Sequence, residues 1–355
     1  MKRLIHSSII LILFLCATVN SQNLPQIRTS PHARILQQIG LSEITIDYHR
    51  PAVLNREIWN NVVPYGTTNL GFGTAKQSPW RAGANENTTI SFSDDVTLNN
   101  QKLPAGTYGL HMIVTDKDWT IIFNKVSTAW GSFFYNPDED ALRITAVPEK
   151  ADFTEWLTYG FENLTTESAD IFLKWENLKV KFNAKFDLDL VVMERYKKTL
   201  VGAPGFNAQT YQQAAAYFIN KNKYLDEASA WIDHSISIQE NGSNLLTKAQ
   251  LLDLKGNNDE AEQLRKRAVE IATETELNTY GYNLLLQQKN IDRAIDIFKM
   301  NVEKHPDSWN VYDSLAEAFA LKGDKANARK NYKLALDKSP ESQKPRIQQA
   351  ITGLE

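Results

Sequence analysis

The sequence predicts two regions, an antiparallel all-β region followed by a C-terminal stack of α-helical hairpins. Three observations predict this order. Apolar residues alternate at every second position between about Ser42 and Phe186, helical spacing replaces this alternation after Asp187, and a 34-residue internal period marks the last third of the chain. The length of 355 residues agrees with two domains, because a typical domain has about 100 to 200 residues.

The β region, expected over residues 22–186, is predicted from short runs that have one apolar face. In the first run Ile44, Ile46 and Tyr48 alternate with polar residues, as expected of a half-buried strand. Turn signals such as Asn99-Asn100 separate the runs, and their close spacing favours a sandwich-like arrangement. The other runs contain Ile90 and Phe92; Tyr108, Leu110 and Met112; and Ile171, Leu173 and Trp175.

Helical spacing begins near residue 187, and we expect a helix and linker over residues 187–206 before a repeat region over residues 207–355. The stretch Gly202-Ala203-Pro204-Gly205 should end the first helix. A 34-residue separation then recurs at a small, an aromatic and a proline position. The three pairs are Ala294 and Ala328, Phe298 and Tyr332, and Pro306 and Pro340.

This period resembles the tetratricopeptide repeat, in which two helices cross closely at a small residue. The unit that contains Tyr312, Leu315 and Gly323 is the clearest match, and the unit with Gly281 departs more. Two earlier units match only at small residues, and residues 341–354 are expected to form a capping helix. The resemblance therefore implies an α-helical solenoid that binds a protein or peptide partner.

The N-terminus predicts a cleaved secretory signal over residues 1–21. Lys2 and Arg3 precede an apolar stretch, Ile9 to Ala17, which is too short to span a bilayer. We therefore expect a periplasmic or secreted protein without a transmembrane segment after cleavage. Cleavage would also remove the single cysteine, Cys16, and with it disulfides and thiolate chemistry.

The charge balance argues against nucleic acid as a partner. The whole chain has 39 Lys and Arg against 42 Asp and Glu, a net charge of −3, and losing Lys2 and Arg3 makes it −5. Nucleic acid binding normally needs a basic surface. We also expect no cofactor, since neither a Walker sequence nor a complete G-x-G-x-x-G sequence is present.

Several motifs in residues 30–182 resemble the family catalogued as domain of unknown function 2911 (DUF2911). The resemblance implies export and an architecture in which helical repeats often follow the domain, but it implies no activity. The loop from Thr67 to Pro79 departs from the family pattern. The main motifs are Tyr48-His49-Arg50-Pro51, Arg56-Glu57-Ile58-Trp59, Val63-Pro64-Tyr65-Gly66, Trp80-Arg81-Ala82-Gly83-Ala84-Asn85-Glu86-Asn87-Thr88 and Leu103-Pro104-Ala105-Gly106-Thr107-Tyr108.

The densest polar and aromatic cluster gives the first candidate site. A guanidinium fork, an amide and an aromatic ring suit a sugar or a carboxylated ligand. The alternative is a structural corner in which Arg81 pairs with Glu86 while Trp80 fills the core. The cluster consists of Tyr65, Trp80, Arg81, Asn85, Glu86 and Thr88.

Two histidines are weaker candidates. The alternation places His49 and His111 on the polar faces of their strands, where a nearby carboxylate would complete a zinc site. Because no HExxH or closely spaced histidine pair is present, ordinary hydrogen-bonded histidines are the favoured interpretation and no metal is expected.

Trp130 and Tyr135 are candidates for stacking against a glycan, with core packing as the alternative. In the repeats, the first helix of each unit should line the concave surface. The residues expected there are Glu276, Thr279, Asn283, Asn310, Asp313 and Glu317. Their acidic and amide side chains do not suit a terminal carboxylate.

These observations favour a non-enzymatic binding or scaffold protein, with the repeats docking a partner protein and the β region holding a partner or small ligand. An extracytoplasmic hydrolase or a carbohydrate-binding module built on the Trp80 to Thr88 cluster is the alternative.

Overall fold

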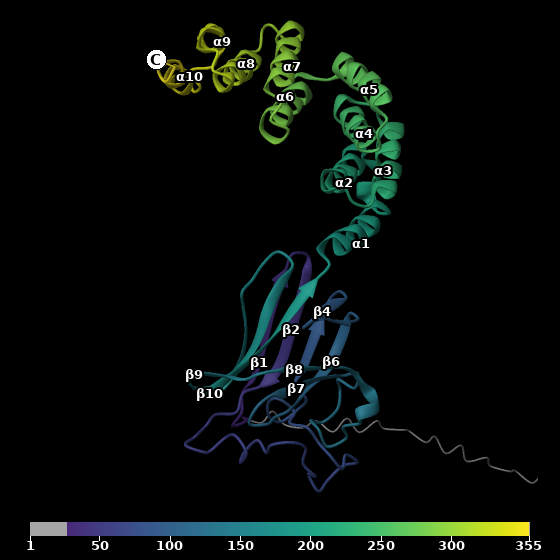
Figure 1. Ribbon diagram of the computed structural model, residues 1–355, viewed down its shortest axis with the longest axis vertical. Helices are drawn as coiled ribbons and strands as arrows, with labels where there is room; N and C mark the ends of the chain where they lie inside the picture. Colours follow the sequence, from purple (N-terminus) through teal and green to yellow (C-terminus); the bar gives the residue numbers. More distant parts are fainter. Residues whose placement is uncertain (1–26, 355) are drawn as a thin grey trace, which may run out of the picture. The chain divides into compact units, whose positions relative to one another are not determined.

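The computed structural model describes residues 27–354 and divides the chain into two units, one ending at Val192 and the other beginning at Met193 (Figure 1). The predicted signal lies outside the described residues. No helix in the described part is long and apolar enough to cross a membrane.

The first unit contains a six-stranded sheet in which every neighbouring pair is antiparallel. Its strands alternate between buried and more exposed positions, most clearly along β2. In spatial order they are β1 (His32–Ile39), β2 (Ser42–His49), β3 (Thr89–Phe92), β6 (Gly106–Ile113), β7 (Trp119–Asn124) and β8 (Asp140–Ala146).

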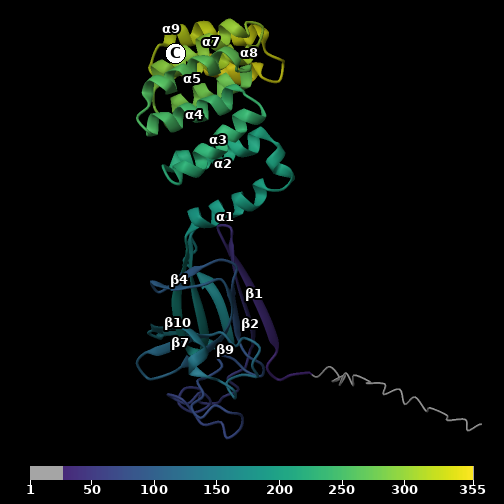
Figure 2. The same cartoon turned by 90° about the vertical axis from the view of Figure 1, so that its right-hand side faces the viewer.

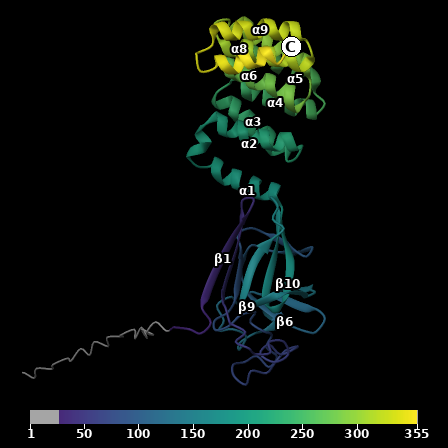
Figure 3. The ribbon, with the colours of Figure 1, turned by 90° about the vertical axis from the view of Figure 1, so that its left-hand side faces the viewer.

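A second antiparallel sheet has four strands, in the order β5 (Gln101–Leu103), β4 (Val96–Leu98), β10 (Ser168–Phe186) and β9 (Glu149–Glu162). Figure 3 shows β1 of the first sheet and β10 of the second in separate layers. The long β10 strand bulges at Glu176, which has a positive φ of 54°.

One apolar core joins the two sheets. Phe123 of β7 packs against Phe182 of β10 with ring centroids 5.8 Å apart, and Tyr48 of β2 packs edge-on against Tyr159 of β9 at 4.8 Å. The period-two pattern predicted one buried face on each strand, and these contacts join the buried faces of strands from both sheets. The antiparallel all-β prediction is confirmed.

The connection between β2 and β3, residues 50–88, contains no extended strand and is held by isolated bridges. Trp80 bridges to Met112 of β6, and Gly66 bridges to Val114. The Tyr159 hydroxyl, which is buried, donates a hydrogen bond of 2.9 Å to the Ala82 carbonyl. The core therefore fixes the backbone on both sides of Arg81.

The second unit is a helical stack (Figure 2). Helix α1 (Leu188–Leu200) spans the division between the units, and the short 3₁₀ helix η2 (Ala203–Phe206) follows it. Four antiparallel pairs and a final helix come next. These are α2 (Ala208–Lys221) with α3 (Leu225–Ile238), α4 (Gly242–Leu254) with α5 (Asn258–Ile271), α6 (Glu274–Tyr282) with α7 (Ile291–Lys304), α8 (Trp309–Lys322) with α9 (Lys325–Lys338), and α10 (Lys344–Thr352).

The 34-residue period matches this packing. Ala294 of α7 and Ala328 of α9 are fully buried, as close helix crossing requires. Pro306 and Pro340 each lie two residues beyond the end of a second helix, at Lys304 and Lys338. Because the two degenerate units also form complete helix pairs, the predicted α-helical repeat region is confirmed.

The third pair contains a local irregularity. Its first helix ends in a π-helical turn, Asn283–Gln287, and α7 begins 17 residues after α6 begins, from 274 to 291. The corresponding step in the fourth pair is 16 residues, from 309 to 325. Because the first pair also has a step of 17 residues, from 208 to 225, without a π-helical turn, the turn is a local feature of the third pair and is not required by the helix spacing.

Gly281 gives a direct test of the close packing in this pair. A Cβ atom on Gly281 would lie 2.4 Å from the ring of Phe298, which is fully buried. We expect Gly281→Ala to lower the free energy of unfolding by about 1 to 2 kcal/mol, because an overpacked core must shift. Urea unfolding of the full chain measures this change.

Gly202→Ala is the matched control. A Cβ atom there comes no closer than 3.5 Å to another group, and the residue has a negative φ. Its unfolding free energy should change by less than about 0.5 kcal/mol, as for most surface substitutions. Equal effects of the two substitutions would contradict the packing explanation.

Candidate functional site

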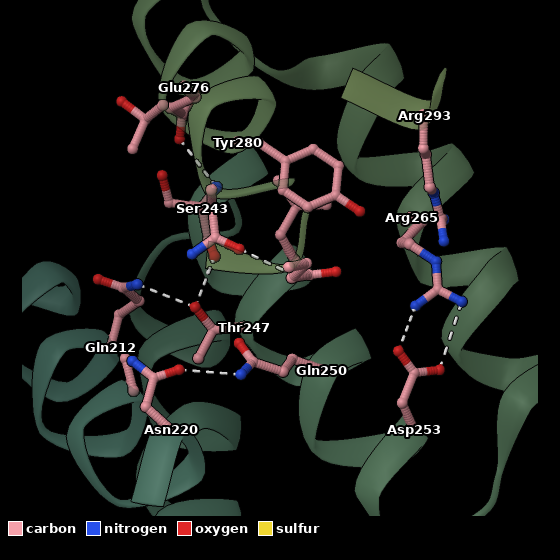
Figure 4. A pocket seen from close by; sticks show the side chains of 15 residues that line it. Gln212, Asn220, Ser243, Thr247, Gln250, Asp253, Arg265, Glu276, Tyr280 and Arg293 are labelled. Atoms are coloured by element: carbon pink, nitrogen blue, oxygen red, sulfur yellow. Dashed lines mark hydrogen bonds and ion pairs between the residues drawn. The ribbon is translucent and has the colours of Figure 1, made fainter. Parts of the chain in front are cut away.

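The first helices of the first three pairs together line a groove (Figure 4). It contains two pockets of about 190 and 530 Å³ that share part of their lining. The shared residues are Gln212 of α2, Ser243 of α4, and Glu276 and Thr279 of α6. Side chains from three successive helix pairs therefore contribute to one polar surface.

Uncharged hydrogen-bonding groups connect the neighbouring helices of the groove. The Gln212 amide donates to the Thr247 hydroxyl at 2.9 Å, and the Gln250 amide donates to the Asn220 side-chain oxygen at the same distance. Figure 4 shows both contacts between α2 and α4. These side chains are held in place while their remaining donors and acceptors still line the groove.

Glu276 is positioned by two local features. It accepts hydrogen bonds from the backbone N–H and the hydroxyl of Thr273, both at 2.9 Å, and so forms the capping box of α6. Its other oxygen accepts the Ser243 N–H at 3.0 Å. These hydrogen bonds lower the pKa of Glu276, although burial of the carboxyl opposes them.

A group of ion pairs lies along one side of the groove. Arg265 donates to both oxygens of Asp253, at 2.7 and 3.3 Å, and also pairs with Glu262 at 2.9 Å. Arg293 pairs with the same Glu262 at 3.2 Å. The hydrogen bond from Arg265 lowers the pKa of Glu262. Both guanidinium groups are thus already paired with carboxylates.

The predicted concave residues fall into two groups. Glu276, Thr279 and Asn283 line the groove. The three on α8 do not line it, because neighbouring helices engage them. Asn310 lies 3.5 Å from Glu274, Asp313 is bonded to Arg346 of α10 at 2.7 Å, and Glu317 accepts from the Tyr282 hydroxyl at 2.6 Å.

Sequence reasoning missed the contributions of the degenerate repeats and the second helices. Counting the 34-residue period back from Asn283 reaches Ala249, which is buried, and the groove residue is its neighbour Gln250, so the period alone did not identify it. Arg265 and Arg293 belong to second helices, and the pattern offered no reason to place them in the groove.

In the first unit, Arg81 does not form the expected ion pair with Glu86. Its Nη1 donates to the Asn85 carbonyl oxygen at 2.5 Å, and its guanidinium lies 4.9 Å from the centre of the Phe133 ring. Glu86 instead pairs with Arg28 at 2.7 Å and contacts His49 at 3.3 Å. The proposed Arg81–Glu86 corner is therefore wrong.

The rest of the polar cluster has mainly structural contacts. The Trp80 ring stacks on Trp175 at an interplanar angle of 17° and donates to the Gly83 carbonyl. Asn85, in the left-handed region at φ 57°, donates to the Ser30 carbonyl, and the buried Thr88 hydroxyl donates to the Ala82 carbonyl. Tyr65 is 38% exposed.

The two histidines have separate partners. His49 contacts Glu86, and its ring lies 5.2 Å from that of His32 at an interplanar angle of 59°. Burial lowers the pKa of His49 despite the Glu86 carboxylate. His111 is 2% exposed, so its predicted place on a polar face is wrong. The segment containing Ser132 and Tyr135 covers it. Within the described residues, no group of three His, Cys, Asp or Glu side chains is placed to hold a metal.

The contact between His111 Nδ1 and the Ser132 hydroxyl, at 2.9 Å, is the nearest arrangement to a nucleophile and base. Burial lowers the pKa of His111 to about 4. A base with this pKa is mismatched to neutral pH, and Ser132 is only 1% exposed. The pair therefore fits a buried structural hydrogen bond.

The two aromatic candidates do not form a common stacking surface. Tyr135 is 9% exposed, and its hydroxyl donates to Asp140 at 2.7 Å and accepts from Arg143 at 2.9 Å. Trp130 is 48% exposed and lies 5.8 Å from the Arg28 guanidinium. The ring of Tyr135 is thus packed in the unit, as the alternative interpretation held.

Residues 30–184 match the family described as "Protein of unknown function (DUF2911)". This match confirms the resemblance that the sequence motifs predicted. No curated protein matches the chain.

Solved structures with some similarity cover the helical part. PilF of Pseudomonas aeruginosa has 14% identity over 43% of this chain and 69% of its own, with a TM-score of 0.29. YrrB, described as a TPR protein with an unusual peptide-binding site, has 20% identity over 46% of this chain and 84% of its own, with a TM-score of 0.27. The C-terminal part of a TPR protein from Cytophaga hutchinsonii has 18% identity over 43% and 63%, with a TM-score of 0.29. At these scores the likenesses imply nothing about what this chain binds.

The buried His111 predicts a dependence of stability on pH. Its pKa is lowered to about 4 in the folded chain, so the unfolded chain binds the proton first as the pH falls through about 6.5. Stability from this group is therefore lost on acidification. Between pH 7 and pH 5 we expect the free energy of unfolding to fall by about 2 kcal/mol, which follows from the two pKa values.

His111→Gln removes the titrating group and keeps a polar side chain near Ser132. Its unfolding free energy should fall by about 2 kcal/mol less over the same pH range. Urea unfolding followed by near-ultraviolet circular dichroism gives both values. Parallel pH profiles of the two proteins would contradict the assignment to His111, because His49 contributes equally to both.

Proposed function

We propose that this chain is a non-enzymatic interaction protein whose helical repeats bind an extended segment of a partner protein in the groove. One observation carries the proposal. Amide and hydroxyl side chains from α2, α4 and α6 line adjoining pockets that share four residues. A surface that presents amide and hydroxyl groups from three successive helix pairs suits a ligand with repeating polar groups, such as a polypeptide backbone.

The chemistry of the groove supports recognition of the backbone. Each peptide group offers one N–H donor and one C=O acceptor, and the amides of Gln250 and Asn283 can serve both. Such contacts are largely independent of the partner's side chains. The groove should therefore accept several sequences with modest affinity.

The charged side chains of the groove limit which segments of a partner protein can bind there. Glu276 is bonded to Thr273 and Ser243, and Arg265 and Arg293 are paired with Asp253 and Glu262. A terminal carboxylate would have to displace one of these carboxylates from its arginine, at the cost of a charge-assisted hydrogen bond. We therefore propose an internal, largely uncharged segment as the ligand.

Selection of a displayed random-peptide library against the full chain tests this function. Enriched peptides should bind with a dissociation constant in the micromolar range, and Gln250→Arg together with Asn283→Arg should weaken them by at least about tenfold by filling the groove. Fluorescence polarisation of labelled peptides measures the affinities. Binding of free and amidated C-termini should be equal.

Gln263→Arg is the matched control, because Gln263 is exposed on α5 and does not line the groove. It should bind the peptides as the unchanged chain does. Enrichment of no peptide, or equal loss of binding in the control, would contradict the proposal.

We also propose that the protein acts outside the cytoplasm. Lys2, Arg3 and the apolar stretch Ile9 to Ala17 support this location. Expressed in a Gram-negative bacterium, the chain should be recovered from the periplasm or medium with Gln22 as its first residue. Replacing Leu13 by Arg should interrupt the apolar stretch and leave an uncleaved cytoplasmic chain, whereas Leu13→Ile should be processed. N-terminal sequencing of each fraction distinguishes these results.

A further inference from the structure

We propose that the β unit contains a pocket for a small organic carboxylate with an apolar body, and that Arg81 binds its carboxylate. This site is separate from the groove of the repeats and goes beyond the function proposed above.

The pocket has a volume of about 570 Å³ and is lined mainly by the connection between β2 and β3. This size lies within the range of small-molecule sites, about 300 to 1,000 Å³. Bridges from Gly66 to Val114 and from Trp80 to Met112 tie the connection to the sheet. These bridges hold part of the pocket wall against the sheet.

The charge of the lining is positive. Arg56 and Arg81 both contribute, and among the described residues that line the pocket none is acidic. Arg56 donates to the carbonyl oxygens of Val53 and Ala52, and Arg81 donates to that of Asn85. Neither arginine forms an ion pair within the described residues. Burial accordingly lowers the pKa of Arg81, with no carboxylate to oppose it.

The open edge of Arg81 has the shape that a carboxylate needs. Nη1 is bonded to Asn85, while Nε and Nη2, which point along a common edge, form no hydrogen bond within the described residues. Two parallel N–H groups bind the two oxygens of a carboxylate. The serine and threonine hydroxyls of the pocket, such as that of Thr68, can add further hydrogen bonds.

The guanidinium is held rigidly. The Phe133 ring lies 4.9 Å from its carbon, and Gly131, at φ 57°, lies so close that a Cβ atom there would be 2.4 Å from the same carbon. A group fixed in this way loses little further freedom when a ligand binds.

The apolar residues that line the pocket define the part of the ligand that carries no charge. Trp80 and Trp175, with nearly parallel rings 6.1 Å apart, line the pocket together with Leu70, Val62 and Pro79. Apolar surface of this kind favours a ligand with an apolar or aromatic body. A small inorganic anion would leave that surface uncovered.

The test uses the full chain and 2-naphthoate as the probe, with binding measured by isothermal titration calorimetry. 2-Naphthylmethanol has the same body without the charge, 2-naphthyl phosphate carries a different anion, and cellobiose represents a neutral glycan. We expect 2-naphthoate to bind at least about tenfold more tightly than 2-naphthylmethanol and cellobiose, because neither of these neutral molecules can pair with the guanidinium fork. Equal binding of the alcohol, or tighter binding of the phosphate or cellobiose, would overturn the proposal.

Substitutions locate the site. Arg81→Gln, and Arg81→Lys, which retains the charge but loses the fork, should each weaken 2-naphthoate about tenfold or more. Leu70→Glu places a carboxylate at the wall on a side chain that is 38% exposed, so it should fold normally and compete for the arginines. Leu70→Glu should therefore also weaken the binding of 2-naphthoate about tenfold or more.

Arg34→Gln is the matched control, because Arg34 is exposed on β1 and does not line the pocket. It should leave the affinity unchanged. If Arg81→Gln does not fold, the affinity of Leu70→Glu for 2-naphthoate tests the proposed site. Unchanged binding of 2-naphthoate to folded Leu70→Glu would overturn the proposed site.

Discussion

Burial of one face of each strand and helix is the constraint on which both units depend. In the β unit, alternate residues such as Ile44 and Ile46 enter a core shared by two sheets. In the repeats, Ala294 and Phe298 enter the space between paired helices. Since a single sheet or helix pair cannot cover its own apolar face, each element needs the next one.

This constraint also decides which surfaces remain available for binding. The connection over residues 50–88 is not itself a strand, but its bridges to the sheet give it a fixed shape with a pocket beside it. In the helical unit, buried small residues lie on both helices of a pair, such as Ala249 of α4 and Ala261 of α5, and polar side chains on α2, α4 and α6 that remain outside the core line the groove. The packing of the two apolar cores therefore determines where both candidate sites lie.

The two sites differ in the state of their charged groups. In the groove, Arg265 and Arg293 are matched by carboxylates, and uncharged amides remain to contact a ligand. In the pocket, Arg56 and Arg81 are bonded to backbone carbonyl oxygens only. Arg56 is exposed, whereas Arg81 is partly desolvated, and a ligand that supplies a carboxylate offsets the cost of burying the Arg81 charge.

Local periodicity by itself determined the order of strands and helices, the 34-residue repeat and the buried places of Ala294 and Ala328, because these follow from side-chain spacing along one element. Half of the predicted concave surface, including Thr279 and Asn283, followed from the same spacing. The partners of Arg81, Glu86 and Asp313, and the burial of His111, were decided only by the tertiary structure. Each depends on segments distant in sequence, and periodicity carries no information about which loop or helix will cover a given face.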